Sequence, residues 1–396
     1  MRRPRSVGLG GLHVGAIDGI LEKPFRGERL ELEDIVRLLE SDEVEKIGRA
    51  AHRMMLRLHP EFPLTTFVVG RNINYANVCD THCLFCAFAR PKGHPEAYVL
   101  TREEILEKVR ELVDVGGTEV LMQGGTHPDL GLAFYEDLLR TIKRHYPNVH
   151  LHSLSVAEVR RMAELDGLSV REVLRRLKAA GLDSLPGAGA EILDDRTRLF
   201  VSRKKGSWRL WVETMEAAHE VGLHTTATMV IGLGESLEER ALHLLRLRAS
   251  QDRARARGFT GYLAFILWTF QPEHTRLALL GYGSRVPPEE YLKHVAVARL
   301  ALDNIPNFQA SWVTMGPEVG VLSLEYGIND MGSTMMEENV VSAAGTVHAV
   351  TTNYLIDLIR SAGRLPAQRN TFYEILRVFS PGEYAERDFV YQSRKP

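Results

Sequence analysis

The chain has 396 residues, 44% of them hydrophobic and 25% charged, and its 49 basic against 51 acidic residues leave a net charge of −2. This composition is typical of a globular protein with a large core, and the near-neutral balance provides no basic surface for nucleic acid. No uninterrupted apolar stretch reaches the roughly 18 residues of a membrane-spanning helix, so we expect small molecules as partners, not nucleic acid or a membrane.

The N-terminus and the cysteines indicate the compartment. The first residues, MRRPR, are basic, but glycines interrupt the segment that follows, and it lacks the apolar centre of a signal peptide. The three cysteines all lie between residues 79 and 86, which argues against a disulfide framework and suits a reducing environment. A cytoplasmic location is therefore expected.

Helical spacing of apolar residues over 30–59 predicts a mainly helical N-terminal extension, which we place at residues 1–64. The β-branched stretch 65–70 then predicts a strand that leads directly into the cysteines. Thr101 and Glu104 form a capping box and predict the start of a helix.

Strands and helices are predicted to alternate from here on. A strand over 118–123, a helix over 132–145 and a strand over 148–154 follow, and the two-residue period of the last places His150 and His152 on one face. Further capping boxes at Ser155/Glu158, Ser169/Glu172 and Ser236/Glu239 predict helix starts, and further strands are predicted over 181–186, 223–232, 261–268 and 307–313.

At least seven alternations of strand and helix, with no linker or repeat between them, predict an α/β fold with a parallel sheet. We expect a (βα)8 TIM-type or closely related barrel over residues 65–375, with a C-terminal tail, 376–396, that packs on or near it. A doubly wound open sheet is the alternative. Active sites of such barrels lie where strands end and βα loops begin. The unusual loops lie there: the cysteine loop, 123–129, 152–155, 186–192, 232–235 and 270–275.

Cys79, Cys83 and Cys86 have the spacing C-x3-C-x2-C, which leaves a metal site one ligand short. A structural zinc ion needs four ligands, and His82 or His94 could complete a Cys3His site. An iron-sulfur cluster held by three thiolates would instead keep one iron without a protein ligand, open to chemistry.

The cysteine motif, with Phe85 just before its last cysteine, resembles the signature of radical S-adenosylmethionine (SAM) enzymes. The resemblance implies that Cys79, Cys83 and Cys86 hold a 4Fe-4S cluster whose open iron is chelated by SAM. MQGG (122–125) is similar to the glycine motif of these enzymes that receives the methionine amino group, and MVIGLGE (229–235) is similar to their adenine-contacting motif.

Several stretches together resemble the menaquinone-biosynthesis branch of this superfamily, from about residue 65 to 375. They are RNINYANVC, GLDSLPGAGAEIL, TTATMVIG, FQPEHT, ASWVTMGPEVG, NDMGSTMMEENVV and PAQRNT. Ala188, where a glycine is expected, and GTVHAV at 345–350 depart from the pattern. These departures bear on the choice of substrate, not on the type of reaction.

The resemblance implies a radical cyclisation of a nucleoside-like substrate of the futalosine pathway. An external flavodoxin- or ferredoxin-like donor supplies an electron, a 5'-deoxyadenosyl radical removes the ribose C4' hydrogen, and a ring closes on an imidazolone of the substrate. Sibling activities, those of aminofutalosine synthase and the deazaflavin FO synthase components, are the alternatives.

Roles for the other site residues follow from the resemblance and from the predicted loops. We expect Phe85, Gln123, Gly124, Gly125, Glu158, Glu191 and Glu235 to contact the cofactor. Simpler explanations exist for some of them: Glu158 also completes a capping box, and loop carboxylates are commonly solvated. His152 is the candidate for handling a proton, because an imidazole titrates in the useful range, with a structural histidine as the alternative.

Overall fold

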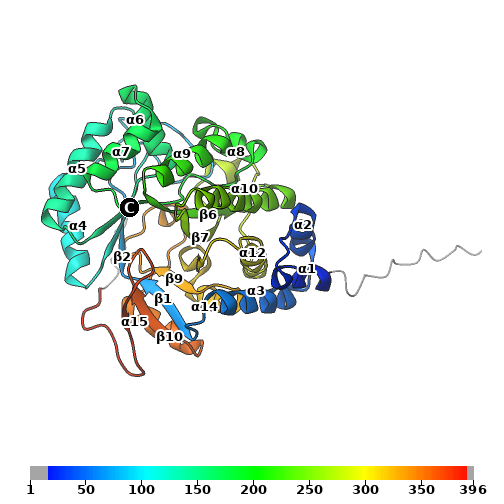
Figure 1. Ribbon diagram of the computed structural model, residues 1–396. Helices are drawn as coiled ribbons and strands as arrows, with labels where there is room; N and C mark the ends of the chain where they lie inside the picture. The colour runs from blue at the N-terminus through cyan, green and yellow to red at the C-terminus, as the bar shows by residue number, and fades with distance from the viewer. Residues whose placement is uncertain (1–16, 390–396) are drawn as a thin grey trace, which may run out of the picture.

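The computed structural model describes residues 17–389, so the predictions for the first and last residues of the chain lie outside the described part. The N-terminal extension is helical, as predicted, with α1 (Asp18–Glu22), α2 (Leu32–Glu40) and α3 (Val44–Leu58). Ile35, Leu38 and Leu39 of α2 are buried, since they share one face of the helix. Figure 1 shows these helices in blue, beside α12 (Pro288–Ala301).

One sheet of 11 strands forms the centre of the molecule, in the order β11-β10-β1-β9-β8-β7-β6-β5-β4-β3-β2. All pairings are parallel except that of β10 with β11. The strands are β1 (Leu64–Val68), β2 (Gly70–Ile73), β3 (Glu119–Met122), β4 (His150–Ser153), β5 (Ser184–Leu185), β6 (His224–Ile231), β7 (Tyr262–Thr269), β8 (Asn307–Gln309), β9 (Asp330–Ser333), β10 (Leu365–Arg369) and β11 (Ile375–Val378).

The sheet is curled into a barrel. β1 lies near one end of the strand order and β2 at the other, yet a single residue, Val69, joins them. The sheet must therefore bend back on itself so that β2 can pair with β3 while β1 pairs with β9 and β10. The predicted barrel is confirmed in this curled form, and the open doubly wound sheet is wrong.

Helices cover the outside of the barrel, as Figure 1 shows for α4 to α7 and α9. The remaining helices are α4 (Arg102–Asp114), α5 (Leu132–His145), α6 (Val156–Asp166), α7 (Val170–Ala180), α8 (Asp195–Val201), α9 (Trp208–Glu220), α10 (Leu237–Ala256), α11 (Arg276–Leu279), α13 (Trp312–Met315), α14 (Pro317–Leu322) and α15 (Thr352–Ser361), with short 3-10 turns η1 (Pro24–Arg26), η2 (Arg203–Lys205), η3 (Ser323–Tyr326) and η4 (Ser342–Ala344). The predicted capping boxes of α4 and α10 are both formed.

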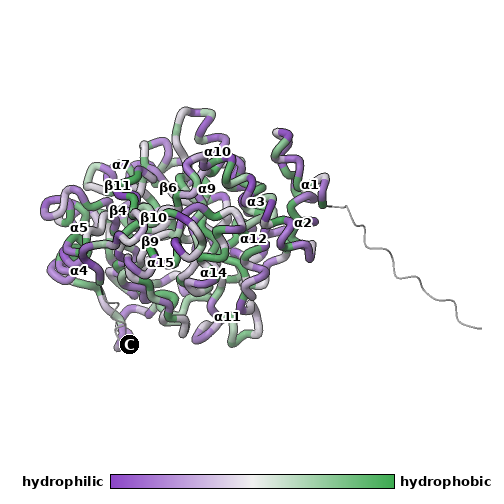
Figure 2. The backbone as a smooth tube through the Cα atoms, turned by 90° about the horizontal axis from the view of Figure 1, so that it is seen from below, coloured by the Kyte–Doolittle hydropathy of each residue, from purple (hydrophilic) through white to green (hydrophobic). Residues whose placement is uncertain are grey.

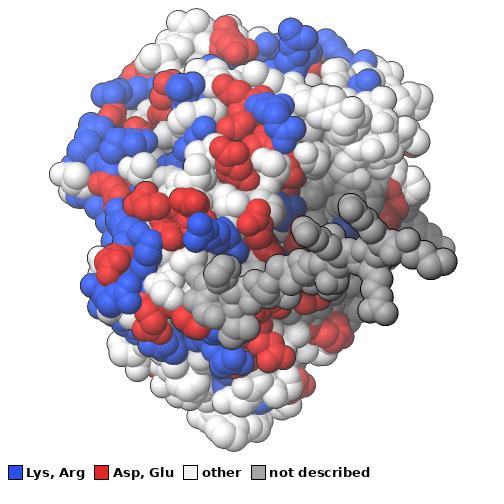
Figure 3. Space-filling model, turned by 90° about the vertical axis from the view of Figure 1, so that its right-hand side faces the viewer, with Lys and Arg blue, Asp and Glu red and all other residues white. Residues whose placement is uncertain are grey.

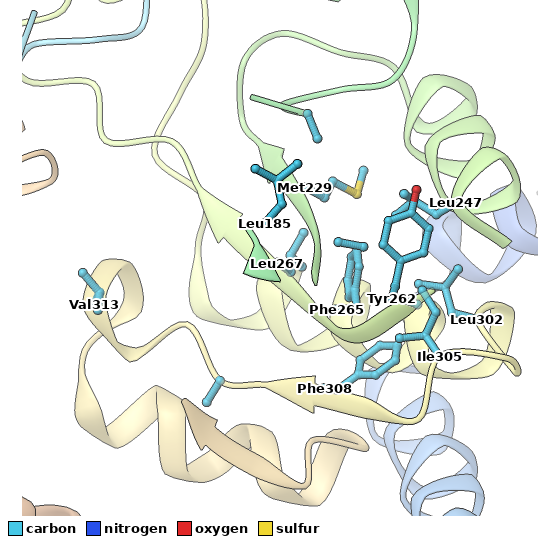
Figure 4. Close-up of a cluster of buried hydrophobic side chains, with 14 of the residues drawn as sticks. Leu185, Met229, Leu247, Tyr262, Phe265, Leu267, Leu302, Ile305, Phe308 and Val313 are labelled. Atoms are coloured by element: carbon cyan, nitrogen blue, oxygen red, sulfur yellow. The ribbon is translucent and has the colours of Figure 1, made fainter. Parts of the chain in front are cut away.

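The two-residue period of the strands divides the barrel into an inner and an outer face. On β6, Thr226 and Thr228 face the interior cavity, whereas Ala227, Met229 and Ile231 are fully buried against the helices. Figure 4 shows part of this outer core, where Met229, Phe265 and Phe308 lie among side chains of α10 and the segment after α12. Much of the hydrophobic core thus lies between the sheet and the helices, and the cavity inside the barrel is lined by apolar and polar side chains together.

Two predicted elements differ in extent. The strand expected over 307–313 ends at Gln309, and α13 begins at Trp312, because Ser311 turns the chain at the cavity and its carbonyl accepts from the amides of Thr314 and Met315. β5 is only two residues long. His150 and His152 share a face of β4, as predicted, and both contact the Ser184 hydroxyl.

None of the helices in residues 17–389 is both long enough and apolar enough to span a membrane. On the face drawn in Figure 3, basic and acidic side chains are interspersed without a large region of one sign.

Candidate active site

A cavity of about 320 Å³ lies inside the barrel and opens at the carboxyl ends of the strands. Phe85 and Gln123 line it near the cysteine loop, and Glu119, His152 and Arg369 line it deeper in the barrel. Of the six loops predicted to converge, those at 85, 123, 152, 186–191 and 270–271 contribute to its wall. The 232–235 loop does not contribute side chains to it.

The cysteine loop is fixed by backbone hydrogen bonds at several points. The Cys79 amide donates to the Arg90 carbonyl (2.9 Å), and the Leu84 amide donates to the Val201 carbonyl (2.8 Å). The Cys79 sulfur lies 3.3 Å from the Thr126 hydroxyl. The three cysteine residues are partly exposed as a whole, and none is in a disulfide.

The surroundings of the thiols fit a cluster with thiolate ligands. Backbone amides of Phe88 and Ala89 point at the Cys86 sulfur, and the positive charge of Lys205 acts on both Cys83 and Cys86. Amide donors and a nearby cation stabilise negative charge on sulfur. Without a metal, burial still raises the pKa of Cys83 to about 11, so iron binding has to displace the proton.

Gly124 and Gly125 allow the second loop to pack directly on the cysteine loop. A Cβ on Gly125 would lie 2.3 Å from the Val78 carbonyl oxygen and 2.5 Å from the Cys79 Cβ, and a Cβ on Gly124 would lie 2.6 Å from the Tyr75 ring. Only glycine fits at such close approach. This contact is an independent reason for the two glycines, beyond their resemblance to a cofactor motif.

Glu158 is buried below this glycine loop. Its Oε1 accepts from the Tyr75 hydroxyl (2.5 Å) and from the Gly124 amide (3.1 Å), while its Oε2 is buried with no hydrogen-bond partner among the described residues. Burial raises the pKa of Glu158 to about 7. A buried carboxylate oxygen without a donor is costly, so this atom is suited to a positively charged ligand group.

Glu191 lies on the cavity wall between two cations. Arg198 (3.2 Å) and Lys205 (2.7 Å) both pair with its carboxylate, and the residue has a left-handed backbone, φ 43°. The Lys205 ammonium also lies 5.5 Å from the centre of the Phe85 ring. These contacts join the 186–192 loop to the cysteine loop.

Glu235 is directed away from the cavity. Its carboxylate accepts from the amides of Gly232 (2.9 Å) and Leu233 (2.7 Å) and pairs with Arg240 (2.7 Å). The side chain therefore fixes the shape of the glycine loop, and its contact with the cofactor stays a prediction.

His152 projects into the cavity from β4. Its Nδ1 lies 2.6 Å from the Ser184 hydroxyl and its Nε2 lies 3.4 Å from the Thr226 hydroxyl. Burial, with a smaller contribution from the Arg369 charge, lowers its pKa to about 3. The imidazole is thus neutral near pH 7 and is a weak base, better suited to hydrogen bonding than to accepting a proton.

Sequence reasoning missed the polar floor of the cavity. Arg369 pairs with Asp330 (2.5 and 2.9 Å), the Thr371 hydroxyl donates to Glu119 (2.7 Å), and Tyr373 lies nearby. Arg369 and Thr371 belong to the PAQRNT stretch, which was noticed only as part of a resemblance. Glu119 at the start of a predicted strand was a usable signal, since an acidic residue there is uncommon.

A zinc site gains no support from the described residues. No three or more His, Cys, Asp or Glu side chains within residues 17–389 are arranged to hold a single metal ion. His82 is exposed, and the Nδ1 of His94 accepts from the Glu96 amide (3.1 Å).

A parallel barrel with a three-cysteine loop and a glycine loop packed on it defines the class of protein, and the family comparison agrees. Residues 73–247 match the radical SAM superfamily, and residues 259–381 match the CofH/MqnC C-terminal region. The chain is a radical SAM enzyme, and it belongs to the family of the cyclic dehypoxanthine futalosine synthases.

Curated relatives support this assignment at high coverage. The chain is 60% identical to cyclic dehypoxanthine futalosine synthase of Halalkalibacterium halodurans over 96% of this chain and 100% of the relative. It is 44% identical to the Streptomyces coelicolor protein of the same name, over 91% and 88% of the two chains. Aminodeoxyfutalosine synthase of Thermus thermophilus is 37% identical over 91% and 96%.

Solved structures show the same fold. The hydrogenase maturase HydG from Carboxydothermus hydrogenoformans superposes with a TM-score of 0.70 at 16% identity, covering 90% of this chain and 80% of its own. Methylornithine synthase (PylB) superposes with a TM-score of 0.67 at 20% identity, covering 88% and 97%.

Proposed function

We propose that this protein closes a ring within dehypoxanthine futalosine, a step of menaquinone biosynthesis, in the cytoplasm. The observation that carries the proposal is the 60% identity over the full length of a cyclic dehypoxanthine futalosine synthase, against 37% for the aminodeoxyfutalosine synthase. The substrate's name states that it has lost hypoxanthine, and with it the imidazole ring of that base. We therefore assign ring closure to the part of the substrate that remains, and not to an imidazolone ring as the sequence resemblance implied.

The three cysteines are proposed to hold a 4Fe-4S cluster, with SAM on its open iron. When bound, the two cofactors supply a 5'-deoxyadenosyl radical that can remove the ribose C4' hydrogen of the substrate. The amides at Cys86 and the cation of Lys205 stabilise the thiolate ligands. Gln123, Gly124 and Gly125 place backbone groups beside the cysteine loop, where SAM is expected.

The cavity wall then has to orient the substrate and exclude water. Glu158 is proposed to receive the amino group of SAM through its unpartnered Oε2, while Phe85 and Glu191 border the cofactor from the other side. Glu235 is retained as a residue that positions the adenine-side loop through its hydrogen bonds to Gly232 and Leu233. The barrel domain is proposed to span residues 65–375, between the helical extension and the tail.

Product analysis tests the reaction. Reduced, cluster-loaded enzyme given SAM and dehypoxanthine futalosine should release 5'-deoxyadenosine together with a product two hydrogens lighter than the substrate, as read by mass spectrometry. Turnover of an aminofutalosine or deazaflavin precursor in place of this substrate would contradict the proposal. Cys83→Ala protein, purified without oxygen, should have lost its iron and its brown colour.

His152 is proposed to hydrogen-bond the substrate in the cavity. His152→Ala should slow product formation at least tenfold while leaving SAM cleavage within about twofold, since the imidazole lines the cavity and its ring nitrogens contact Ser184 and Thr226, not the cysteines. Product and 5'-deoxyadenosine should be quantified in the same reactions. Equal loss of both would indicate a structural role for His152. The matched control is His219→Gln, which changes a buried histidine outside the cavity lining and should leave both rates as in the parent.

A further inference from the structure

An exposed apolar surface lies directly on the outside of the cysteine loop. Leu279 is 85% exposed and Leu280 56%, which is unusual for large apolar side chains. We define the loop-side patch as the exposed side chains of Leu199, Phe200, Leu279, Leu280 and Tyr282. Figure 2 shows α11, which contributes Leu279, at the periphery of the molecule.

Two backbone hydrogen bonds attach this patch to the cysteine loop. Leu84, between two cluster ligands, donates its amide to the Val201 carbonyl (2.8 Å) at the end of α8, and its carbonyl accepts from the Leu277 amide (2.8 Å) on α11. The Phe200 and Tyr282 rings, 4.9 Å apart, join the two sides. The apolar groups are therefore held at a fixed position beside the cysteines.

Cations without carboxylate partners border the patch. Arg203 and Arg276 are exposed and make no ion pair with any described residue, and Lys204 donates to the Asp80 carbonyl within the cysteine loop. Glu273, the acidic residue closest in sequence to Arg276, is already paired with Arg285 (2.6 Å). The patch is thus locally positive, although the chain as a whole has a net charge of −2.

We propose that the loop-side patch is the docking site of an acidic electron-carrier protein that reduces the enzyme. This inference rests on the proposed function, which needs one electron delivered to the cysteine loop. At the patch no bond is made or broken: the carrier is oxidised by one electron and the enzyme is reduced by one. Apolar side chains supply contact area, and the surrounding cations orient a negatively charged partner and speed its association.

Two double variants test the patch without altering any residue of the cavity. Leu279→Asp with Leu280→Asp removes the apolar contact, and Arg203→Glu with Arg276→Glu reverses the charge. The matched control is Leu56→Asp with Arg57→Glu on α3, which lies apart from α8 in Figure 1 and apart from α11 in Figure 2. Lys204 is left unchanged because it holds the cysteine loop.

The first readout is binding of a flavodoxin to cluster-loaded enzyme, measured by calorimetry at low and high salt. Both patch variants should bind about tenfold more weakly than the parent, and the charge variant should also lose its salt dependence. The α3 control should bind as the parent does. Unchanged binding in both patch variants would overturn the proposal. Light scattering that shows a dimer for the parent and a monomer for the patch variants, with carrier binding unaffected, would also overturn it, because the patch would then join two copies of the chain.

The second readout separates this inference from the proposed function. With dithionite as reductant, the patch variants should form product within about twofold of the parent, and with reduced flavodoxin they should be at least tenfold slower. Loss of both activities would show that the patch acts on the site itself, which overturns the docking role. If the parent forms no cyclic product even with dithionite, the proposed function fails while the binding measurement still decides the docking site.

Discussion

Close contacts determine which residue type fits at single positions of this site. Gly125 packs on Val78 and Cys79, and the buried carboxylate of Glu158 accepts from the Gly124 amide. In both cases burial, not the residue type alone, decides what the position can do.

Gly125→Ala should prevent the cysteine loop from holding its cluster. The new Cβ would overlap the Val78 carbonyl and the Cys79 Cβ, both much closer than van der Waals contact, so the loop must move. Iron per chain after anaerobic reconstitution should fall at least severalfold. Gly19→Ala, where a Cβ meets nothing within 4 Å, is the control, and full iron content in the Gly125 variant would contradict this reading.

Glu158→Gln should weaken SAM binding about tenfold, because a charge-assisted contact to the ammonium group would be lost. The raised pKa of Glu158 has a separate consequence for stability. The folded protein holds this proton up to about pH 7 and the unfolded chain only to about 4.5, so the group's contribution to stability is lost as pH rises through this window. At pH 8 the Glu158→Gln variant should therefore have a higher free energy of unfolding than the parent, because its uncharged side chain costs less to bury.

Calorimetry with SAM and urea unfolding at pH 8 measure the two effects of this substitution. Ser169→Ala is the control, since it removes the equivalent N-cap hydroxyl, which accepts from the backbone amide of Glu172 at the start of α7 and makes no contact with Glu158. It should cost about 1 kcal/mol of stability and leave SAM affinity unchanged. Unaltered SAM affinity in Glu158→Gln would remove this residue from the cofactor site.

At the scale of elements, β10 completes the floor of the barrel. It pairs with β1 along Leu64–Phe67, and its last residue, Arg369, forms a fully buried ion pair with Asp330 of β9. The strand thus connects the C-terminal part of the chain with the interior of the barrel. The stability of β10 in the barrel therefore depends on Asp330, which neutralises the buried charge of Arg369.

Arg369→Met should destabilise the protein by about 3–5 kcal/mol, because it leaves Asp330 charged and buried without its partner. Adding Asp330→Leu should recover part of the loss, although the contacts of Asp330 with Thr66 and Gly332 are then absent. Urea unfolding of the single and double variants measures both. A single variant within about 1 kcal/mol of the parent would show that the pair contributes little.

For the molecule as a whole, buried histidines determine the response to acid. Burial lowers the pKa of His152 and His243 to about 3 and that of His219 to about 4. Below about pH 6.5 the unfolded chain binds protons that the folded protein does not, so their contribution to stability is present above this pH and lost as pH falls toward 3–4. Glu158 opposes this trend with a single proton.

The free energy of unfolding should therefore fall as pH is lowered from 7 to 5, by up to about 1.4 kcal/mol per histidine per pH unit. Urea titrations across this range measure the slope. His219→Gln should flatten it by removing one titrating group. Equal slopes in the parent and His219→Gln would exclude His219 as a source.

How far the sequence could predict this molecule differs between elements and contacts. Capping boxes at Thr101 and Ser236, the two-residue period of β4 and the strand pattern over 223–232 are local signals, and the structure contains the elements they predicted. The end of β8 at Gln309 was missed, because the turn at Ser311 depends on hydrogen bonds formed only in the folded barrel. The partners of Glu191 and the floor around Arg369 were missed for the same reason.

The sequence by itself determined the reaction class, since the three cysteines lie within eight residues and each glycine motif is a short continuous stretch of the chain. It also determined the alternation of strands and helices, because that pattern depends on local periodicity. Only the tertiary structure decided which carboxylates face the cavity, that Glu235 turns away from it, and that exposed leucines lie on the outside of the cysteine loop. These facts depend on contacts between segments far apart in sequence, and burial and charge at each position follow from those contacts.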